Sequence, residues 1–80
     1  MPYVVYILQD EQKRLYKGVT NNLDRRLREH KAGKTRTTAR MGKQLMVVYT
    51  ETFNVFDKAR AREVYFKTSA GRKFLKNILT

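Results

Sequence analysis

Five side chains in this sequence of 80 residues have the types needed for acid–base chemistry on an anionic substrate. They are two phenols, a guanidinium, an imidazole and a carboxylate, namely Tyr6, Tyr16, Arg26, His30 and Glu63. An arginine fork binds phosphate with two hydrogen bonds, and a tyrosine or histidine beside a water molecule can act as a general base. One carboxylate can hold a hydrated Mg²⁺ together with substrate oxygens. This combination is the one that hydrolysis of a phosphodiester requires.

Both tyrosines lie on expected strands. Residues 3–8 are continuously apolar or aromatic, which indicates a strand buried on both faces. A polar turn over residues 9–13 leads to a second strand at residues 14–19, and the short spacing predicts an antiparallel hairpin. A turn centred near Glu11 would place Tyr6 directly opposite Tyr16, although two such tyrosines can equally be an ordinary cross-strand pair.

Arg26 and His30 lie on the apolar stripe of an expected helix. We predict that Asn21 caps this helix and that Gly33 follows its end. At 100° per residue, Arg26 and His30 share the face of Leu27, where polar groups destabilise a fold unless they are paired or used. Taken singly, the histidine could be a satisfied helix residue and the arginine a structural ion-pair partner of the distant carboxylate.

Glu63 is a lone carboxylate on another apolar stripe. Its helix is expected to start after Asn54, and it follows a third strand at residues 45–50. Acidic residues are almost never fully buried without a partner or a metal. An ion pair with Arg60 or Lys67 at helical spacing is the alternative explanation. Ser69 could cap a last helix.

The composition favours a single domain, over residues 1–80, with a nucleic-acid partner. The net charge of +11 indicates a polyanion, and the basic residues do not oppose a wide apolar face of the kind that enters lipid. The sequence has no cysteine and no apolar run long enough to span a bilayer, which predicts a cytoplasmic protein. The pattern of elements predicts an α+β fold, two layers thick, in which a three-stranded antiparallel sheet is flanked by three helices. We expect all the apolar faces to meet in one core, which would bring the five side chains together.

These residues resemble the GIY-YIG nuclease superfamily, and in particular its small stand-alone bacterial members. Val4–Tyr6 and Tyr16–Gly18 stand where the two family triplets stand. Arg26 and His30 follow the second triplet at the family's spacing, and Ala59–Glu63 matches the family's Ala-x-x-Arg-Glu pattern. The resemblance covers nearly the whole chain and extends to the N-terminal domain of the excision-repair nuclease and to homing endonucleases.

The resemblance implies an endonuclease that uses one Mg²⁺ or Mn²⁺ ion, bound by Glu63. It implies that Tyr16 acts as, or assists, the general base, while Tyr6 orients the water or the substrate. Arg26 would bind the scissile phosphate, and His30 would assist proton transfer or positioning. The expected substrate-binding residues are Gly18, Arg26, Lys34, Arg36 and Arg40.

The sequence departs from the family pattern at three points. Val4 replaces the glycine of the first triplet, and Lys17 replaces the isoleucine of the second. Lys17 should point to the face opposite Tyr16 and stay away from the chemistry. The family's late asparagine has no clear equivalent, so Asn77 is not assigned to it.

The sequence therefore favours a metal-dependent endonuclease, with DNA favoured over RNA as substrate and repair or processing as its role. A binding module with the nuclease fold and little activity of its own is the alternative, and a purely structural partner of a larger complex is a third option. We expect no appended DNA-binding domain, so a protein partner could select the target. The sequence does not define the oligomeric state.

Overall fold

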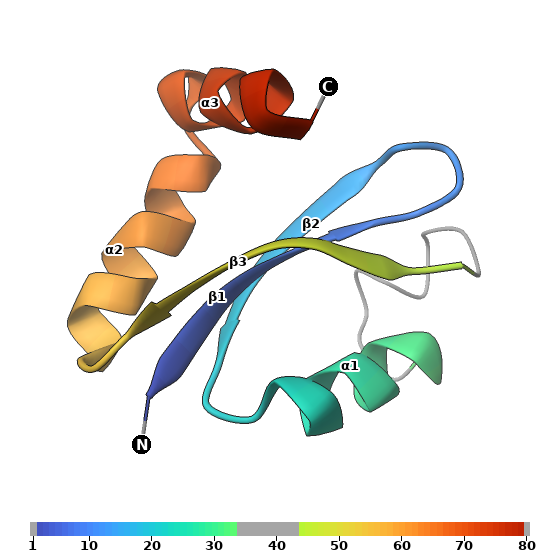
Figure 1. The fold of residues 1–80 in the computed structure, drawn as a ribbon, viewed down its shortest axis with the longest axis horizontal. Helices are drawn as coiled ribbons and strands as arrows, with labels where there is room; N and C mark the ends of the chain where they lie inside the picture. Colours follow the sequence, from blue (N-terminus) through green and yellow to red (C-terminus); the bar gives the residue numbers. More distant parts are fainter. Residues whose placement is uncertain (1, 34–43, 80) are drawn as a thin grey trace.

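A computed structural model describes residues 2–33 and 44–79, which form one antiparallel sheet and three helices. The strands stand in the order β2-β1-β3, so β1 is central and β2 is an edge strand (Figure 1). This confirms the predicted α+β class, with three antiparallel strands flanked by three helices. Within the described parts, no helix is long and apolar enough to cross a membrane. The elements in chain order are β1 (Tyr3–Gln9), β2 (Leu15–Thr20), α1 (Leu23–Lys31), β3 (Met46–Phe53), α2 (Phe56–Phe66) and α3 (Ser69–Leu79).

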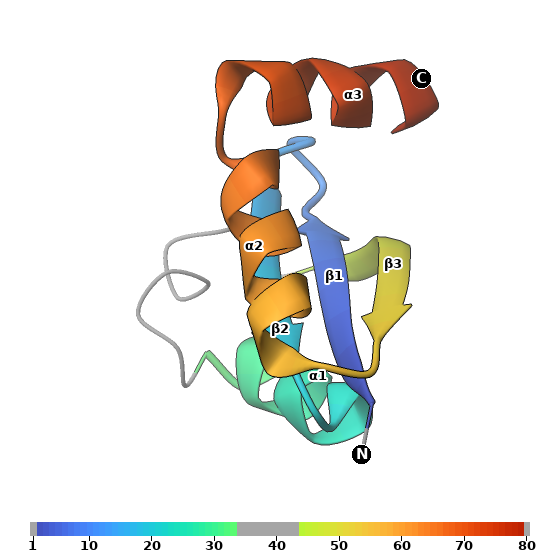
Figure 2. The same ribbon diagram turned by 90° about the vertical axis from the view of Figure 1, so that its left-hand side faces the viewer.

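The helices cover both faces of the sheet, so the molecule has three layers where its length suggested two (Figures 1 and 2). Successive side chains of a strand point to opposite faces, and two apolar clusters result. One joins Val5 and Ile7 to α2 and α3, through Phe66 and Leu75. The other lies under α1. The expected single core is therefore wrong, because the sheet separates α1 from the other two helices.

The hairpin register differs from the prediction by two residues. Tyr6 pairs with Gly18, and Tyr16 pairs with Leu8. A shift of two residues keeps every side chain on its face, so both tyrosines still point toward α1. They are diagonal neighbours, with ring centroids 6.1 Å apart.

The shift in register comes from the turn between β1 and β2. The buried Asp10 carboxylate accepts hydrogen bonds from the backbone N–H of Gln12 at 3.0 Å and of Arg14 at 2.8 Å. The Arg14 guanidinium also bonds to Asp10 at 2.8 Å, and Lys13 adopts the left-handed conformation with φ of 66°. A buried aspartate satisfied by backbone donors fixes a turn, and here it moves the centre toward the second strand.

The start of α1 lies one residue later than predicted. Asn22, not Asn21, is the N-cap, and its side chain accepts from the backbone N–H of Arg25 at 3.0 Å. The Thr20 hydroxyl accepts from the Asn22 backbone N–H at 3.0 Å, and this local turn uses up one more residue. Gly33 follows the helix with φ of 72°, as predicted.

The caps predicted for α2 and α3 were also misplaced by one residue. Val55 precedes α2 and gives no side-chain cap, so Asn54 is not the cap. The Thr68 hydroxyl, rather than that of Ser69, accepts from the backbone N–H of Gly71 at 3.1 Å at the start of α3. The same hydroxyl donates to the Tyr65 carbonyl at 2.6 Å and so ties the end of α2 to the start of α3.

Candidate active site

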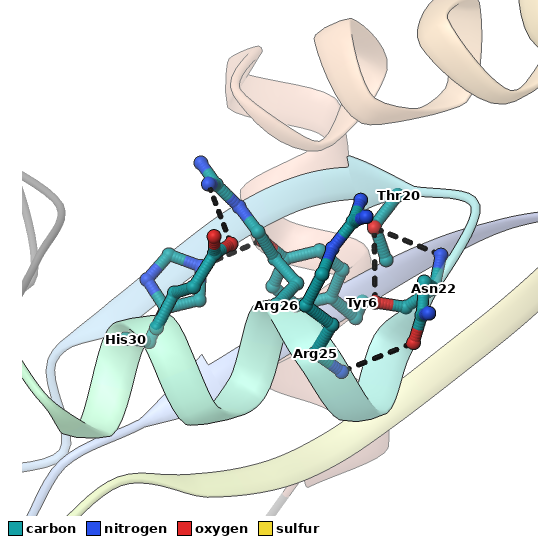
Figure 3. A network of polar contacts seen from close by, with 7 residues as sticks. Tyr6, Thr20, Asn22, Arg25, Arg26 and His30 are labelled. Carbon is teal, nitrogen blue, oxygen red and sulfur yellow. Dashed lines mark hydrogen bonds and ion pairs between the residues drawn. The ribbon is translucent and has the colours of Figure 1, made fainter.

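Tyr6 of β1 and His30 of α1 meet in one cluster (Figure 3), and the Tyr16 ring of β2 lies against both. The Tyr6 hydroxyl and His30 Nε2 are 2.7 Å apart, and both residues are only 1% exposed. The Tyr16 ring meets His30 edge-on, with centroids 4.7 Å apart. The helical phase and the strand face thus placed these three residues correctly, even though the register was wrong.

Gly18 makes room for Tyr6. A Cβ atom at this position would lie 2.5 Å from both Cζ and the hydroxyl of Tyr6, which is closer than side-chain atoms tolerate. The sequence suggested Gly18 as a substrate-binding residue. In the structure, the Tyr6 ring occupies the space where a Gly18 side chain would lie. Gly18 therefore allows Tyr6 to take its place in the cluster.

Arg26 connects the buried cluster to solvent. Its guanidinium bonds to the Tyr6 hydroxyl, which is the main cause of its raised pKa. Its side chain is 36% exposed, and it also pairs with Glu29 at 3.3 Å. Arg26 therefore has donors inside the cluster and an accessible face that an anion can approach.

The buried pair is neutral at physiological pH. Burial raises the pKa of Tyr6 to about 12, although its bond to Arg26 acts in the opposite direction. Burial and the nearby Arg26 charge lower the pKa of His30. The protonated phenol and the neutral imidazole share one hydrogen bond, between the Tyr6 oxygen and His30 Nε2. Tyr6 is therefore not a base, and its bonds fix the positions of Arg26 and His30.

Tyr16 is the half-buried member of the cluster and stands at the free edge of the sheet. It borders a hollow of about 390 Å³ that is also lined by Lys17, Lys67 and Arg72. Lys17 points to the other face of the sheet, as expected. It nevertheless borders the same hollow as Tyr16, because no further strand covers the outer side of β2 in the part of the chain that the structure describes.

Glu63 lies on α2, in the layer on the other side of the sheet. Its side chain is 13% exposed and pairs with Lys67 Nζ at 2.5 Å, so the ion pair weighed as an alternative is present. Among the described residues, its hydrogen bonds and ion pairs include none to Tyr6, Tyr16, Arg26 or His30. The structure therefore brings four of the five predicted residues together, while α2 carries the fifth on the opposite face, alongside the edge strand β2 (Figure 2).

Metal binding would depend on this one carboxylate. Residues 2–33 and 44–79 contain no group of three histidine, cysteine, aspartate or glutamate side chains able to hold an ion. A cage of protein ligands alone is therefore not available here. A single carboxylate fits a Mg²⁺ ion that keeps several waters and shares substrate oxygens, and Lys67 is the group that such an ion would displace.

Two further sets of residues concern the site: three predicted substrate-binding residues, and one arginine to which the sequence gave no role. Lys34, Arg36 and Arg40, which the sequence suggested for substrate binding, lie outside the described residues. The sequence also gave no role to Arg62, which bonds to Glu51 at 2.9 and 3.1 Å. Its guanidinium lies 4.7 Å from the Phe66 ring centroid and is close to two further rings. The arginine of the Ala-x-x-Arg-Glu segment thus clamps α2 to β3, while its neighbour Glu63 faces elsewhere.

Comparisons with known proteins agree with this architecture. The model of the GIY-YIG catalytic domain family matches residues 2–77. A UPF0213 protein of Staphylococcus haemolyticus is 33% identical over 95% of this chain and 93% of its own length. A UPF0213 protein of Lactiplantibacillus plantarum is 40% identical, over 81% of this chain and 66% of its own length. The solution NMR structure of a UPF0213 protein from Bacillus halodurans superposes with a TM-score of 0.60 at 28% identity, covering 98% of this chain and 85% of that one.

Proposed function

Because the chain belongs to the GIY-YIG catalytic domain family, whose members are nuclease-type hydrolases of nucleic acid, we propose that it is a divalent-metal-dependent endonuclease. Its substrate is DNA in preference to RNA, its role is repair or processing, and it works in the cytoplasm. One observation carries the proposal. A buried network of Tyr6, His30 and Arg26 holds an accessible guanidinium beside Tyr16, within a strongly basic chain.

The residues would divide the reaction as follows. Arg26 binds the scissile phosphate through its exposed donors and neutralises charge that develops there. Tyr16 contacts the attacking water as general base or as its positioning partner. Tyr6 and His30 are positioning residues, because both are buried and act through Arg26 and Tyr16. Precise placement of such groups supplies much of the rate enhancement in phosphoryl chemistry.

The metal belongs to Glu63 in this proposal. When bound, a Mg²⁺ or Mn²⁺ ion supplies electrostatic stabilisation of the scissile phosphate and the leaving oxygen. The contribution of the chain is to present the carboxylate beside the edge of β2 and to release it from Lys67.

Cleavage assays with matched variants test the proposal. Wild-type protein should nick plasmid, single-stranded or branched DNA with Mg²⁺ or Mn²⁺, and EDTA should stop it. Tyr16→Phe should lower the rate at least about 100-fold, the usual loss when a general base is removed. Glu63→Gln should lower it by a similar factor, because it removes the carboxylate that would hold the metal. Lys73→Gln, a surface change on α3, serves as the control. Equal cleavage by all four proteins would identify a contaminating nuclease and reject the enzyme assignment.

The same assays address the binding-module alternative. Tight, salt-sensitive binding by a wild type that cleaves none of these substrates would favour a module that needs a partner protein for targeting or activity. An RNA substrate cleaved faster than its DNA equivalent would reverse the substrate preference and leave the reaction type unchanged.

A further inference from the structure

A second cationic surface begins where Tyr16 reaches the edge of the sheet. The hollow beside Tyr16 has three basic side chains in its wall: Lys17 from β2, Lys67 from the end of α2, and Arg72 from α3. A neighbouring hollow of about 560 Å³ shares Leu15 and Arg72 with it and adds Lys13 and Lys76. The two adjoining hollows are thus lined by five basic side chains in all.

The crowding of these positive charges should destabilise the folded state. Burial lowers the pKa of Lys17, and the charges of Arg72 and Lys67 lower it further. Among the ion pairs of the described residues, Lys67 is joined to Glu63, and none joins Lys17 or Arg72 to a carboxylate. Crowded like charges with partial burial destabilise a small domain. An anion in the hollow would relieve that repulsion.

Lys17 is also the position where this chain departs from the second of the two family triplets. Isoleucine stands there in the family pattern, and that apolar side chain would pack under α2 and α3 without adding charge. Compared with isoleucine, the half-buried lysine packs less apolar surface but adds a positive charge to the wall of the hollow. Tyr16 lines the same hollow, so an anion bound there would lie next to the proposed catalytic tyrosine.

We propose that Lys17, Lys67 and Arg72 form a phosphate-binding subsite for the backbone of the substrate strand, next to the phosphodiester held by Arg26 and Tyr16. The proposal rests on the nuclease function proposed above and adds the direction of the strand. The substrate leaves Tyr16 along the edge of β2 toward α3, and its phosphates pass Lys17 first and Lys76 last. Lys67 takes part by exchanging Glu63 for the phosphate.

The test separates binding from cleavage. A fluorescein-labelled 20-base-pair DNA is titrated in EDTA at several NaCl concentrations, with wild type, Lys17→Met and a control, Lys58→Met. Lys58 is exposed at the start of α2 and lines neither hollow. Each lost phosphate contact lowers the slope of log K against log salt by about 0.9. We expect that loss for Lys17→Met and none for Lys58→Met.

Thermal unfolding of the same proteins supplies a second readout. Lys17→Met should raise Tm, because it removes a crowded, partly buried charge, while it weakens DNA binding. If Lys17 only supported the fold, Lys17→Met would lower Tm and weaken DNA binding together. An unchanged salt slope, or a fall in Tm accompanied by weaker binding, would overturn the subsite. Inorganic phosphate should also shift the amide resonances of residues 15–17, 67 and 72 in wild type, and shifts confined to α1 would count against it.

These results are independent of catalysis. If the metal-dependent cleavage assay fails while Lys17→Met lowers the salt slope, the subsite stands and the nuclease proposal falls. If cleavage is robust and Lys17→Met binds with the wild-type slope, the nuclease stands and the subsite falls.

Discussion

At the scale of single residues, the cluster depends on a phenol that stays protonated. Tyr6 is buried and hydrogen-bonds to both His30 and Arg26, so one hydroxyl joins β1 to two side chains of α1. A buried polar group with all partners present specifies a geometry, whereas the loss of one partner leaves the others unsatisfied. Tyr6 therefore links the stability of the fold to the placement of the guanidinium.

The raised pKa of Tyr6, about 12 against 10 in the unfolded chain, predicts alkaline destabilisation. The folded state favours the protonated phenol, so this stabilisation is complete below pH 10 and is lost as the pH rises to 12. The loss amounts to ~2–3 kcal/mol. Urea unfolding of wild type and Tyr6→Phe at pH 8 and at pH 11 measures it. Wild type should lose more stability than the variant between the two values, and equal losses would contradict the assignment.

The lowered pKa of His30 predicts that the protein loses stability at acidic pH. Its pKa is lowered by burial and by Arg26, so the unfolded chain takes up a proton first as the pH falls below 6.5. The stabilisation contributed by neutral His30 is therefore present above pH 6.5 and is lost as the pH falls through the lowered folded value. His30→Gln, which keeps a hydrogen-bonding side chain, should show a smaller loss of stability between pH 7 and pH 5 by urea unfolding. A wild type and variant with parallel profiles would rule out this histidine as the cause.

Gly18 predicts a steric effect at the same cluster. Gly18→Ala forces the new methyl group against the Tyr6 ring and should lower the free energy of unfolding by roughly 1–3 kcal/mol, as overpacking does. The partner substitution, Tyr6→Leu, removes the ring atoms that the new methyl group would meet. A double-mutant cycle should therefore show that the alanine is less harmful in the Tyr6→Leu background. Additive effects would show that the two residues do not compete for space.

At the scale of elements, the junction between α2 and α3 is held by a close backbone contact. A Cβ on Gly71 would lie 2.6 Å from the Cα of Phe66 and would also meet the carbonyl oxygen of Tyr65. Both neighbours are backbone atoms, which cannot rotate away as a side chain can. The glycine thus sets the angle at which α3 leaves α2, and with it the position of Arg72 beside the edge of the sheet.

Gly71→Ala should therefore destabilise the protein even though alanine favours helix. The gain in helix propensity is about 1 kcal/mol, and the clash should exceed it, because the two helix backbones would have to separate. Chemical denaturation measures the difference. Asn77→Ala, an exposed change on α3, should leave stability unchanged or raise it slightly, and a Gly71→Ala protein as stable as wild type would disprove the close contact.

Prediction from the sequence worked best where periodicity decides the outcome. Helical phase assigned Arg26 and His30 to the inward face, and strand alternation assigned Tyr6 and Tyr16 to one side of the sheet. The register failed because it depends on how Asp10 satisfies backbone donors, which no hydrophobic pattern reveals. The expectation that Glu63 shares a core with the tyrosines failed for a similar reason. Periodicity tells which face of a helix is buried, but not which face of the sheet that helix covers.

At the scale of the whole molecule, a net charge of +11 on 80 residues dominates association with a polyanion. If about six phosphates are contacted, affinity for DNA should fall roughly 10³-fold between 50 and 200 mM NaCl. Filter binding in EDTA with two unrelated DNA sequences measures this, and both should give the same slope. A nearly flat dependence on salt would instead favour a structural role in a larger complex.

The central position of β1 has a consequence for synthesis of the chain. β1 leaves the ribosome before the other five elements described here, yet its Tyr3 pairs with Phe53 of β3. Until β3 has emerged, one edge of this buried strand stays open and its α2 face is uncovered. Pairing across such a sequence separation is slow compared with local contacts. The nascent chain can form the β1–β2 hairpin early, but it cannot complete either apolar layer of the sheet until more than half of the chain has been made.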